Sequence, residues 1–358
     1  MENILKVLMT GFLILILVIS PCQGSYFFHL NIFSYDKVKD IPESIIPKDD
    51  AFHGIQEQLT NEWWYFDAVF ENGYGIHVGI KVISFAGRWG VVNQIINVYN
   101  HSIIEHQVSN MDLIDQFTIS QNYPWISYQG KPILIFDYAE YNQTGNWNYS
   151  INVQVENIKV NLTFIQRTQG FKYVTAHEGW TVAQPKAIVN GVLTIDNQII
   201  PVQGKGYHDH NWNFSLSTGL RSKGWYWGKV SSSNYTLTWA KILKMPFVTE
   251  EIVENIAIFN TIDEGFVHIE PENMKFSIDE KIFLNGRFIP TDFGLIINQD
   301  DIELNVTFHA VSIQKAPPDF LTIHYWRYFV SVSGYIEKDG KRDYLDNDLH
   351  IIEHVRFI

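Results

Sequence analysis

The stretch INVQVENIKVNLTF, residues 151–164, decides the fold class of this chain. Apolar and polar residues alternate along it and β-branched residues are frequent, which is the pattern of strands with one buried face. The same alternation recurs in short stretches elsewhere, at residues 63–70, 74–85, 235–243, 302–311 and 326–336. We therefore predict an all-β protein.

Turn signals separate these stretches. Glu-Asn-Gly at 71–73, Val-Asn-Gly at 189–191 and Lys-Asp-Gly at 338–340 have the composition of hairpin turns. Only TEEIVENIAIF, residues 249–259, favours a helix, and its length allows a single short one.

The length of 358 residues favours two domains of ordinary size. Each half contains enough strands for an antiparallel barrel or sandwich. No linker rich in Pro, Gly or Ser separates the halves, so we expect two closely fitting domains that join near residues 204–214.

The N-terminus predicts export. An apolar run follows Lys6 and is too short to span a membrane comfortably, so residues 1–24 are interpreted as a signal peptide cleaved near Gly24. An uncleaved membrane anchor is the alternative, and either one places the protein outside the cytoplasm. Cys22, the single cysteine, would leave with the signal, and the mature protein would then have no disulfide.

The composition and charge limit the classes of partner that we expect. A content of 46% hydrophobic residues is too apolar for a disordered chain. The net charge of −13 argues against nucleic acid as a partner. We also expect no stable protein partner.

The stretch NEWWYFDAVF at residues 61–70 is aromatic on both faces if it is extended. Glu62 and Trp64 share one face, and Trp63 and Tyr65 share the other. The strand is either buried on both sides for structural reasons, or Glu62 and Trp64 face a ligand cavity. A carboxylate among aromatic rings would have a raised pKa and could hold a proton near neutral pH.

The stretch GKGYHDHNWNF at residues 204–214 places His208 and His210 on one face of a strand and Asp209 on the other. Histidines two apart can bind zinc or copper, but no spacing signature supplies further ligands, so we predict no metal and no cofactor. We expect Asp209 to accept a hydrogen bond from a histidine and fix its tautomer. Such a pair serves catalysis or a buried structural network equally well.

A third stretch, KGWYWGKV at residues 223–230, puts Trp225 and Trp227 on one face and Tyr226 on the other. It fits either a packed core or the wall of an apolar pocket. No nucleophile elbow, phosphate loop, dinucleotide fingerprint or His-Glu-x-x-His motif is present.

Three stretches together resemble, in order and spacing, the carotenoid 1,2-hydratase family, also called hydroxyneurosporene synthase, and its AttH-like relatives. They are residues 61–79, 185–214 and 224–230, and the middle one is the most specific. The resemblance implies two lipocalin-like β-barrels packed side by side, at residues 50–212 and 213–358. Barrels of this size can hold one small ligand.

The resemblance implies protonation of an alkene followed by capture of the cation by water. Carried over by position, the candidate catalytic residues are Asp209, His210, His208 and Glu62. The candidate ligand contacts are Trp63, Trp64, Tyr65, Trp212, Trp225 and Trp227.

Two departures bear on the reaction. Asn213 follows Trp212 where the family pattern has glycine, and it opens a glycosylation sequon. The stretch YTLTWAKI at residues 235–242 also lacks the carboxylate that the hydratases carry on that strand. We therefore expect either an enzyme that hydrates, isomerises or cyclises an apolar, possibly isoprenoid, molecule, or a non-catalytic carrier of a lipid or pigment.

Overall fold

The computed structural model describes residues 41–175, 178–215, 218, 221–246, 252–262, 264–284, 287–316 and 324–357. The sheets described below belong to one unit, Val38–Ile358. The predicted signal peptide at residues 1–24 lies outside the described residues.

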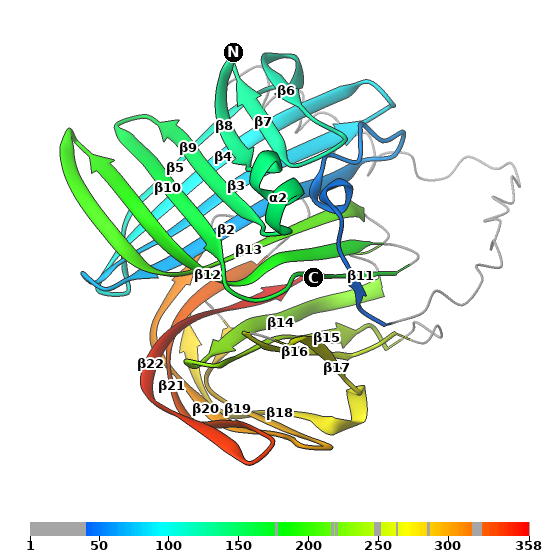
Figure 1. The fold of residues 1–358 in the computed structure, drawn as a ribbon, viewed down its shortest axis with the longest axis vertical. Coiled ribbons are helices and arrows are strands. Elements are labelled where there is room, and N and C mark those ends of the chain that lie inside the picture. Colours follow the sequence, from blue (N-terminus) through cyan, green and yellow to red (C-terminus); the bar gives the residue numbers. More distant parts are fainter. Residues whose placement is uncertain are drawn as a thin grey trace, which may run out of the picture. The chain divides into compact units, whose positions relative to one another are not determined.

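The first sheet has 13 antiparallel strands and curves into a nearly closed barrel (Figure 1). Its order is β5-β4-β3-β2-β13-β12-β10-β9-β8-β7-β6, with β11 paired to β12 and β1 to β11. The strands are β1 (Glu43–Ser44), β2 (Thr60–Phe70), β3 (Tyr74–Phe85), β4 (Trp89–Asn100), β5 (Ile103–Leu113), β6 (Phe117–Ile119), β7 (Trp125–Tyr128), β8 (Lys131–Phe136), β9 (Asn148–Val155), β10 (Ile158–Gln166), β11 (Phe171–Val174), β12 (Gly179–Ile195) and β13 (Gln198–Ser215).

The second sheet has nine antiparallel strands in the order β17-β16-β15-β14-β22-β21-β20-β19-β18 and forms a half-barrel. The strands are β14 (Ser222–Ser231), β15 (Tyr235–Lys244), β16 (Asn255–Thr261), β17 (Gly265–Ile269), β18 (Met274–Leu284), β19 (Arg287–Gln299), β20 (Ile302–Lys315), β21 (His324–Lys338) and β22 (Lys341–Arg356).

Helices in the described part of the chain are short. They include η1 (Pro47–Asp50), η2 (Ile114–Gln116), α2 (Tyr138–Thr144) and η3 (Pro271–Asn273). Asp137 caps α2 by accepting a hydrogen bond from the Glu140 amide, and Gly145 ends it in the left-handed conformation. None of these helices has the length and apolar character needed to cross a membrane.

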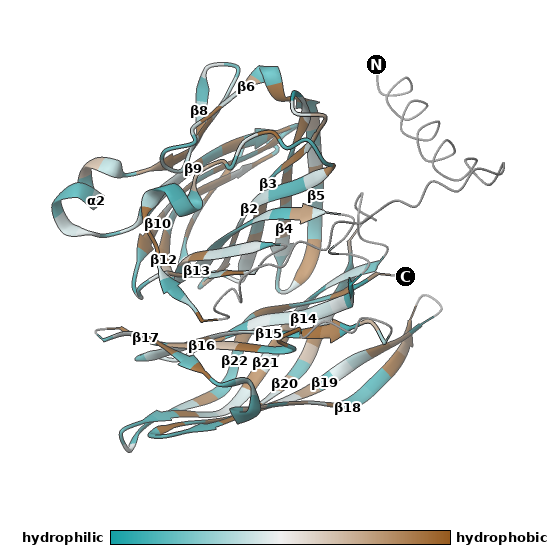
Figure 2. Cartoon of the chain, turned by 90° about the vertical axis from the view of Figure 1, so that its right-hand side faces the viewer, coloured by the Kyte–Doolittle hydropathy of each residue, from teal (hydrophilic) through white to brown (hydrophobic). Residues whose placement is uncertain are grey.

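The alternation of apolar and polar residues that predicted strands also determines which side chains form the two cores. In the hairpin of β9 and β10, Ile151, Val153, Val160 and Leu162 point into the barrel and are buried, while the residues between them are more exposed. Hydrophobic and hydrophilic residues follow one another along the strands (Figure 2). The all-β prediction and the two side-by-side barrels are confirmed.

The outer faces of the two sheets meet through aromatic and charged residues. Tyr65 and Tyr207 of the first sheet share a buried cluster with Trp227 of the second. The fully buried Arg327 on β21 donates a hydrogen bond to the hydroxyl of Tyr99 on β4 (3.1 Å). Since β13 ends at Ser215 and β14 begins at Ser222, the chain passes from one sheet to the other within seven residues.

Two local predictions are wrong. The part of residues 249–259 that the structure describes contains no helix, because residues 255–261 form β16 and pair with β15. The Val-Asn-Gly at 189–191 is not a turn but lies inside β12. Gly191 has a φ of 155°, and a Cβ there would lie 2.1 Å from the Asn161 carbonyl oxygen, so the glycine allows β10 and β12 to approach.

Candidate functional site

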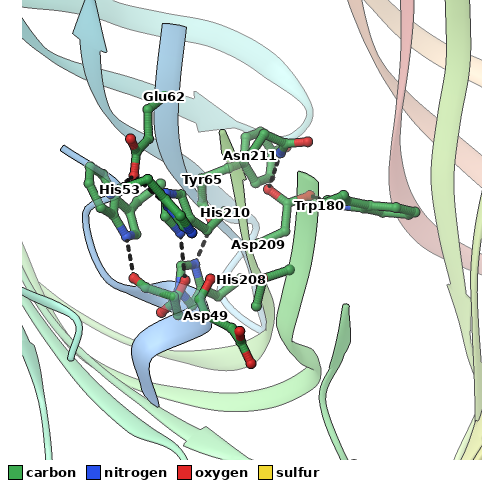
Figure 3. A network of polar contacts seen from close by, with 12 residues as sticks. Asp49, His53, Glu62, Tyr65, Trp180, His208, Asp209, His210 and Asn211 are labelled. Atoms are coloured by element: carbon green, nitrogen blue, oxygen red, sulfur yellow. Dashed lines mark hydrogen bonds and ion pairs between the residues drawn. The ribbon is translucent and has the colours of Figure 1, made fainter. Parts of the chain in front are cut away.

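Strand β13 carries two separate polar clusters, one on each face (Figure 3). It pairs with β2 so that His208 lies opposite Phe66 and His210 opposite Trp64. The two histidines point into the barrel of the first sheet. Asp209 points the other way, toward the second sheet, because successive side chains on a strand alternate.

The barrel cluster is centred on Asp50, a residue that the sequence did not single out. Asp50 ends the short helix η1 and is fully buried. Its Oδ2 accepts a hydrogen bond from the hydroxyl of Tyr149 (2.7 Å) and lies 3.0 Å from Nε2 of His208. Nδ1 of His208 lies 2.9 Å from the Tyr65 carbonyl oxygen, so both ring nitrogens of His208 face acceptors.

His210 continues this cluster toward the barrel mouth. Its Nδ1 lies 3.4 Å from Oδ1 of Asp50, and its Nε2 lies 3.0 Å from Oε1 of Glu62. The same Glu62 oxygen accepts a hydrogen bond from the backbone amide of His53 (2.9 Å) and lies 3.0 Å from His53 Nδ1. A continuous line of polar contacts therefore runs from Tyr149 in the core, through Asp50, His210 and Glu62, to His53.

Aromatic rings hold the three imidazoles in place. Phe66 stacks on His208 with ring centroids 3.8 Å apart, and Trp64 stacks on His210 at 4.3 Å. The ring of Trp212 is parallel to that of His53, 4.3 Å away. This packing leaves the imidazoles little freedom to rotate, so their hydrogen-bond directions are fixed.

The cluster is charged at neutral pH. Burial alone would raise the pKa of Asp50, but His208 and His210 outweigh it and lower this pKa. Glu62 behaves likewise, because burial raises its pKa while His210 and His53 lower it below the usual value. The expectation of a raised pKa at this carboxylate is therefore wrong. Burial lowers the pKa of His210, but the negative charge of Asp50, whose Oδ1 lies 3.4 Å from Nδ1, and the hydrogen bond and charge of Glu62 raise it to about 9. At pH 7 His210 is therefore a cation between two carboxylates.

The outer end of the cluster opens into a cavity of about 280 Å³. Its lining residues are His53, Gln56, Thr60, Glu62, Trp212 and Asn213. The His53 side chain is 28% exposed, whereas that of His210 is fully buried. His53 is thus the imidazole of the cluster that a bound molecule can touch.

The same residues have the donor types of a metal site. One ligand atom from each of His53, Glu62 and His210 lies within 4.8 Å of the other two, and a His-His-Glu set suits a divalent ion. In the structure these atoms are bound to one another by hydrogen bonds, which accounts for their positions without an ion. The prediction of no metal stays a prediction.

The opposite face of β13 shows that one expectation is wrong. Among the residues that the structure describes, Asp209 contacts no histidine. Its Oδ2 accepts hydrogen bonds from Nε1 of Trp180 (2.8 Å) and the hydroxyl of Tyr207 (2.9 Å), and its Oδ1 accepts one from Nδ2 of Asn211 (3.3 Å). Adjacent residues on a strand point to opposite faces, so Asp209 cannot reach His208 or His210.

Asp209 accepts its described hydrogen bonds from neutral groups, but charged residues lie nearby. Burial raises its pKa to about 7; the hydrogen bonds from Trp180 and Tyr207 lower it, and the negative charges of Glu353 and Asp67 add to the rise. The nearby cation, Lys229, pairs with Asp67 instead. Burial lowers the pKa of Lys229, although Asp67 opposes this.

Of the six aromatic residues predicted to contact a ligand, Trp212 lines the cavity. Trp64 is buried behind it against His210. The other four, Trp63, Tyr65, Trp225 and Trp227, pack where the two sheets meet. Glu62 and His210 belong to the barrel cluster, as does His208, and Asp209 lies apart from them.

Asn213 occupies a bulge in the pairing of β13 with β2. Its φ is 58°, in the left-handed region that glycine and asparagine tolerate better than other residues. This accounts for asparagine at a position where the resembled family has glycine. The residue is exposed and lines the cavity.

Sequence reasoning missed Asp50 and did not select His53. Both lie just before the aromatic strand β2, in the segment that follows Pro47. An acidic pair and a histidine within five residues were the available signal. Nothing in their spacing linked them to His208 and His210, which lie more than 150 residues further along the chain.

No family model and no curated protein matches the chain. Several solved structures have a fold similar to that of the chain. A protein assigned as AttH from Nitrosomonas europaea is similar with a TM-score of 0.61 and 12% identity, over 88% of this chain and 98% of that one. Kievitone hydratase from Nectria haematococca has a TM-score of 0.56 and 11% identity, over 87% and 93%. CghA with Sch210972 has a TM-score of 0.56 and 11% identity, over 84% and 89%. The fold implied by the sequence resemblance is thereby confirmed.

Proposed function

We propose that the protein is an acid–base enzyme that adds water to an activated carbon–carbon double bond, or removes it, with His53 as the proton-transfer group. The observation that carries the proposal is the Glu62–His53 pair at the wall of the cavity, backed by the buried line through His210 and Asp50. An imidazole held by a carboxylate is a frequent general base and acid.

Each of the four residues has its own role in the proposed reaction. His53 donates its Nδ1 proton to Glu62, which leaves Nε2 as the nitrogen that exchanges protons with water or substrate. Glu62 stabilises the imidazolium that forms. His210 and Asp50 position Glu62, and the positive charge of His210 keeps Glu62 ionised.

For hydration, His53 takes a proton from water as the water oxygen bonds to one alkene carbon. The imidazolium then returns a proton to the other carbon, so one water is added and His53 is regenerated. An imidazolium is a weak acid for an isolated alkene, which favours a double bond conjugated to a carbonyl group. Asn213 is an exposed amide at the cavity that could donate a hydrogen bond to such a carbonyl.

The volume and polarity of the cavity limit the kind of substrate that it can bind. Its volume equals that of about nine water molecules, and most of its lining side chains are polar. We propose that it receives the polar, reactive end of an otherwise apolar molecule, with the apolar part outside the cavity. An isoprenoid with an oxidised end group meets this description.

The fold supports the proposal. One structural neighbour is named a hydratase, and the sequence resemblance is to a hydratase family, so we propose that the chain is a distant member of that family. A non-catalytic carrier fits less well, because large side chains such as Phe66, Tyr149 and Phe164 fill the barrel interior. Export through residues 1–24 remains part of the proposal.

The test is a hydration assay in water labelled with oxygen-18. The purified protein is incubated with an α,β-unsaturated ketone of terpenoid type and, separately, with an acyclic isoprenoid hydrocarbon, and label in the product is measured by mass spectrometry. We expect label in the ketone adduct only. His53→Gln should lower the rate at least 100-fold, in the range found for a lost general acid or base.

The matched control is His309→Gln. His309 also places Nδ1 near a carboxylate, Asp292 (2.6 Å), but on the exposed surface of β20. Its loss should leave the rate unchanged. Full activity of the His53 variant, or binding of the ketone without any labelled product, would refute the proposed reaction. We expect the activity to be unchanged after treatment with a chelator. Loss of activity after chelation would favour a metal ion bound by His53, Glu62 and His210.

A further inference from the structure

A second cavity shares no lining residue with the site above. Its volume is about 410 Å³. It is lined by residues 166–170, at the end of β10 and in the connection to β11, by Tyr141 and residues 145–147 at the end of α2, and by Ile45 and Ile262. Nothing in the proposed reaction uses it.

The charge of this cavity differs from that of the chain. The protein carries a net charge of −13, yet no carboxylate lines the cavity and Arg167 is its one charged residue. The Arg167 side chain is exposed and takes part in no ion pair among the described residues. A guanidinium without a counter-ion, in a cavity without acids, favours an anionic ligand.

Neutral groups complete the lining. Asn146 and Gln169 present exposed amides, and Tyr141, Ile45 and Ile262 supply apolar surface. Beneath them Thr168 is 2% exposed, and its hydroxyl has no hydrogen-bond partner in the described chain. Amides beside an aromatic ring suit a ligand with several hydroxyl groups.

The floor of the cavity is fixed from both sheets. Asn260 on β16 donates a hydrogen bond to the carbonyl of Gln169 (2.8 Å). A Cβ on Gly170 would lie 2.5 Å from Ile45 and 2.7 Å from the carbonyl oxygen of Ala183, so only glycine fits there. The cavity is therefore a built feature and not a gap left by a loose loop.

We propose that this cavity binds a hydroxylated monocarboxylate of about monosaccharide size, such as a hexuronate. One guanidinium balances one negative charge, and its planar fork matches a carboxylate through two parallel hydrogen bonds. The volume, that of about fourteen water molecules, accommodates a single sugar ring. The proposal does not depend on the reaction proposed above.

The test measures binding of three probes by isothermal titration calorimetry. D-Glucuronate has both charge and hydroxyl groups, D-glucose has the ring without the charge, and hexanoate has the charge without the hydroxyl groups. We expect glucuronate to bind at least tenfold more tightly than either of the others. Arg167→Gln should weaken glucuronate binding at least tenfold and leave glucose binding unchanged.

Two further variants keep the test decisive. Arg88→Gln removes an exposed arginine from the turn between β3 and β4 and should bind glucuronate like the unmodified protein. Arg167→Lys keeps the charge but loses the fork, and should have intermediate affinity. Thermal melting checks that each variant folds. Equal affinity of the Arg167→Gln variant and the unmodified protein for glucuronate would overturn the proposal, as would the absence of glucuronate binding at millimolar concentration.

Discussion

The two faces of β13 bury polar side chains in different ways. On the barrel face, His210 lies between the carboxylates of Asp50 and Glu62, so opposite charges are paired. On the face toward the second sheet, Asp209 is held by neutral donors from Trp180, Tyr207 and Asn211. Residues adjacent in sequence therefore belong to two separate clusters.

The difference decides which face can act on a ligand. The barrel cluster reaches a cavity through Glu62 and His53, while Asp209 is enclosed where the two sheets meet. It also decides the response to pH. Pairing lowers the pKa of Asp50 and raises that of His210, whereas burial raises the pKa of Asp209 and the negative charges of Glu353 and Asp67 add to the rise.

These pKa shifts determine whether each group adds stability at low or at high pH. The lowered pKa values of Asp50 and Glu62 add stability that is lost as the pH falls below about 4, the range of free carboxyl groups. The raised pKa of His210 adds stability that is fully present below pH 6.5 and lost as the pH rises through about 9. The raised pKa of Asp209 favours the protonated protein, and this contribution is lost as the pH rises through about 7.

The largest effect is expected for Asp50→Asn. The variant keeps the shape of the side chain but leaves His210 buried with one carboxylate instead of two. Breaking a buried ion pair costs about 3–5 kcal/mol, and we expect a loss of this size in the free energy of unfolding at pH 7. Urea denaturation measures it. A loss below about 1 kcal/mol would mean that the barrel cluster is not held by charge pairing.

A smaller effect of a different kind is expected for Asp209→Asn. The amide cannot ionise, so the variant escapes the cost of burying a charge above pH 7. Relative to the variant, the unmodified protein should lose about 1.4 kcal/mol of stability between pH 6 and pH 8, as one pKa unit of linkage gives. Asp67, Glu353 and Lys229 remain in both proteins. Parallel stability curves for the two proteins would contradict the raised pKa.

The smallest effect is expected for Asn213→Gly. Glycine adopts the φ of 58° without strain, so the free energy of unfolding should change by less than about 0.5 kcal/mol. Asn213→Val is the contrasting variant, and a β-branched residue in this conformation should cost about 1–3 kcal/mol. Equal stabilities of the glycine and valine variants would show that the left-handed bulge is not what the position requires.

Much of the fold could be predicted because alternation is a local property. The faces of β2, β13 and β14 follow from their sequences, and the structure confirms them. Residues 255–261 could not be predicted, because pairing with β15 overrides a local pattern that also suits a helix. The turn between β12 and β13 is formed by Asp196 and Asn197, both with positive φ, and not by the glycine at 191.

The candidate site was harder to predict from the sequence than the fold. Alternation already implies that Asp209 and His210 face opposite ways, so the expected bond between Asp209 and a histidine could have been excluded. The true partners, Asp50 and Glu62, reach the histidines only because η1 and β2 pack against β13. Contacts between residues about 150 positions apart leave no local signal.

The protonation of His210 tests the central claim most directly. In uniformly ¹⁵N-histidine-labelled protein, with the His210→Gln variant used for assignment, long-range ¹H–¹⁵N spectra report the state of each ring nitrogen. We predict that His210 carries protons on both nitrogens at pH 7.5 and loses one near pH 9. A neutral His210 at pH 7.5 would contradict the charge-paired cluster on which the proposed site depends.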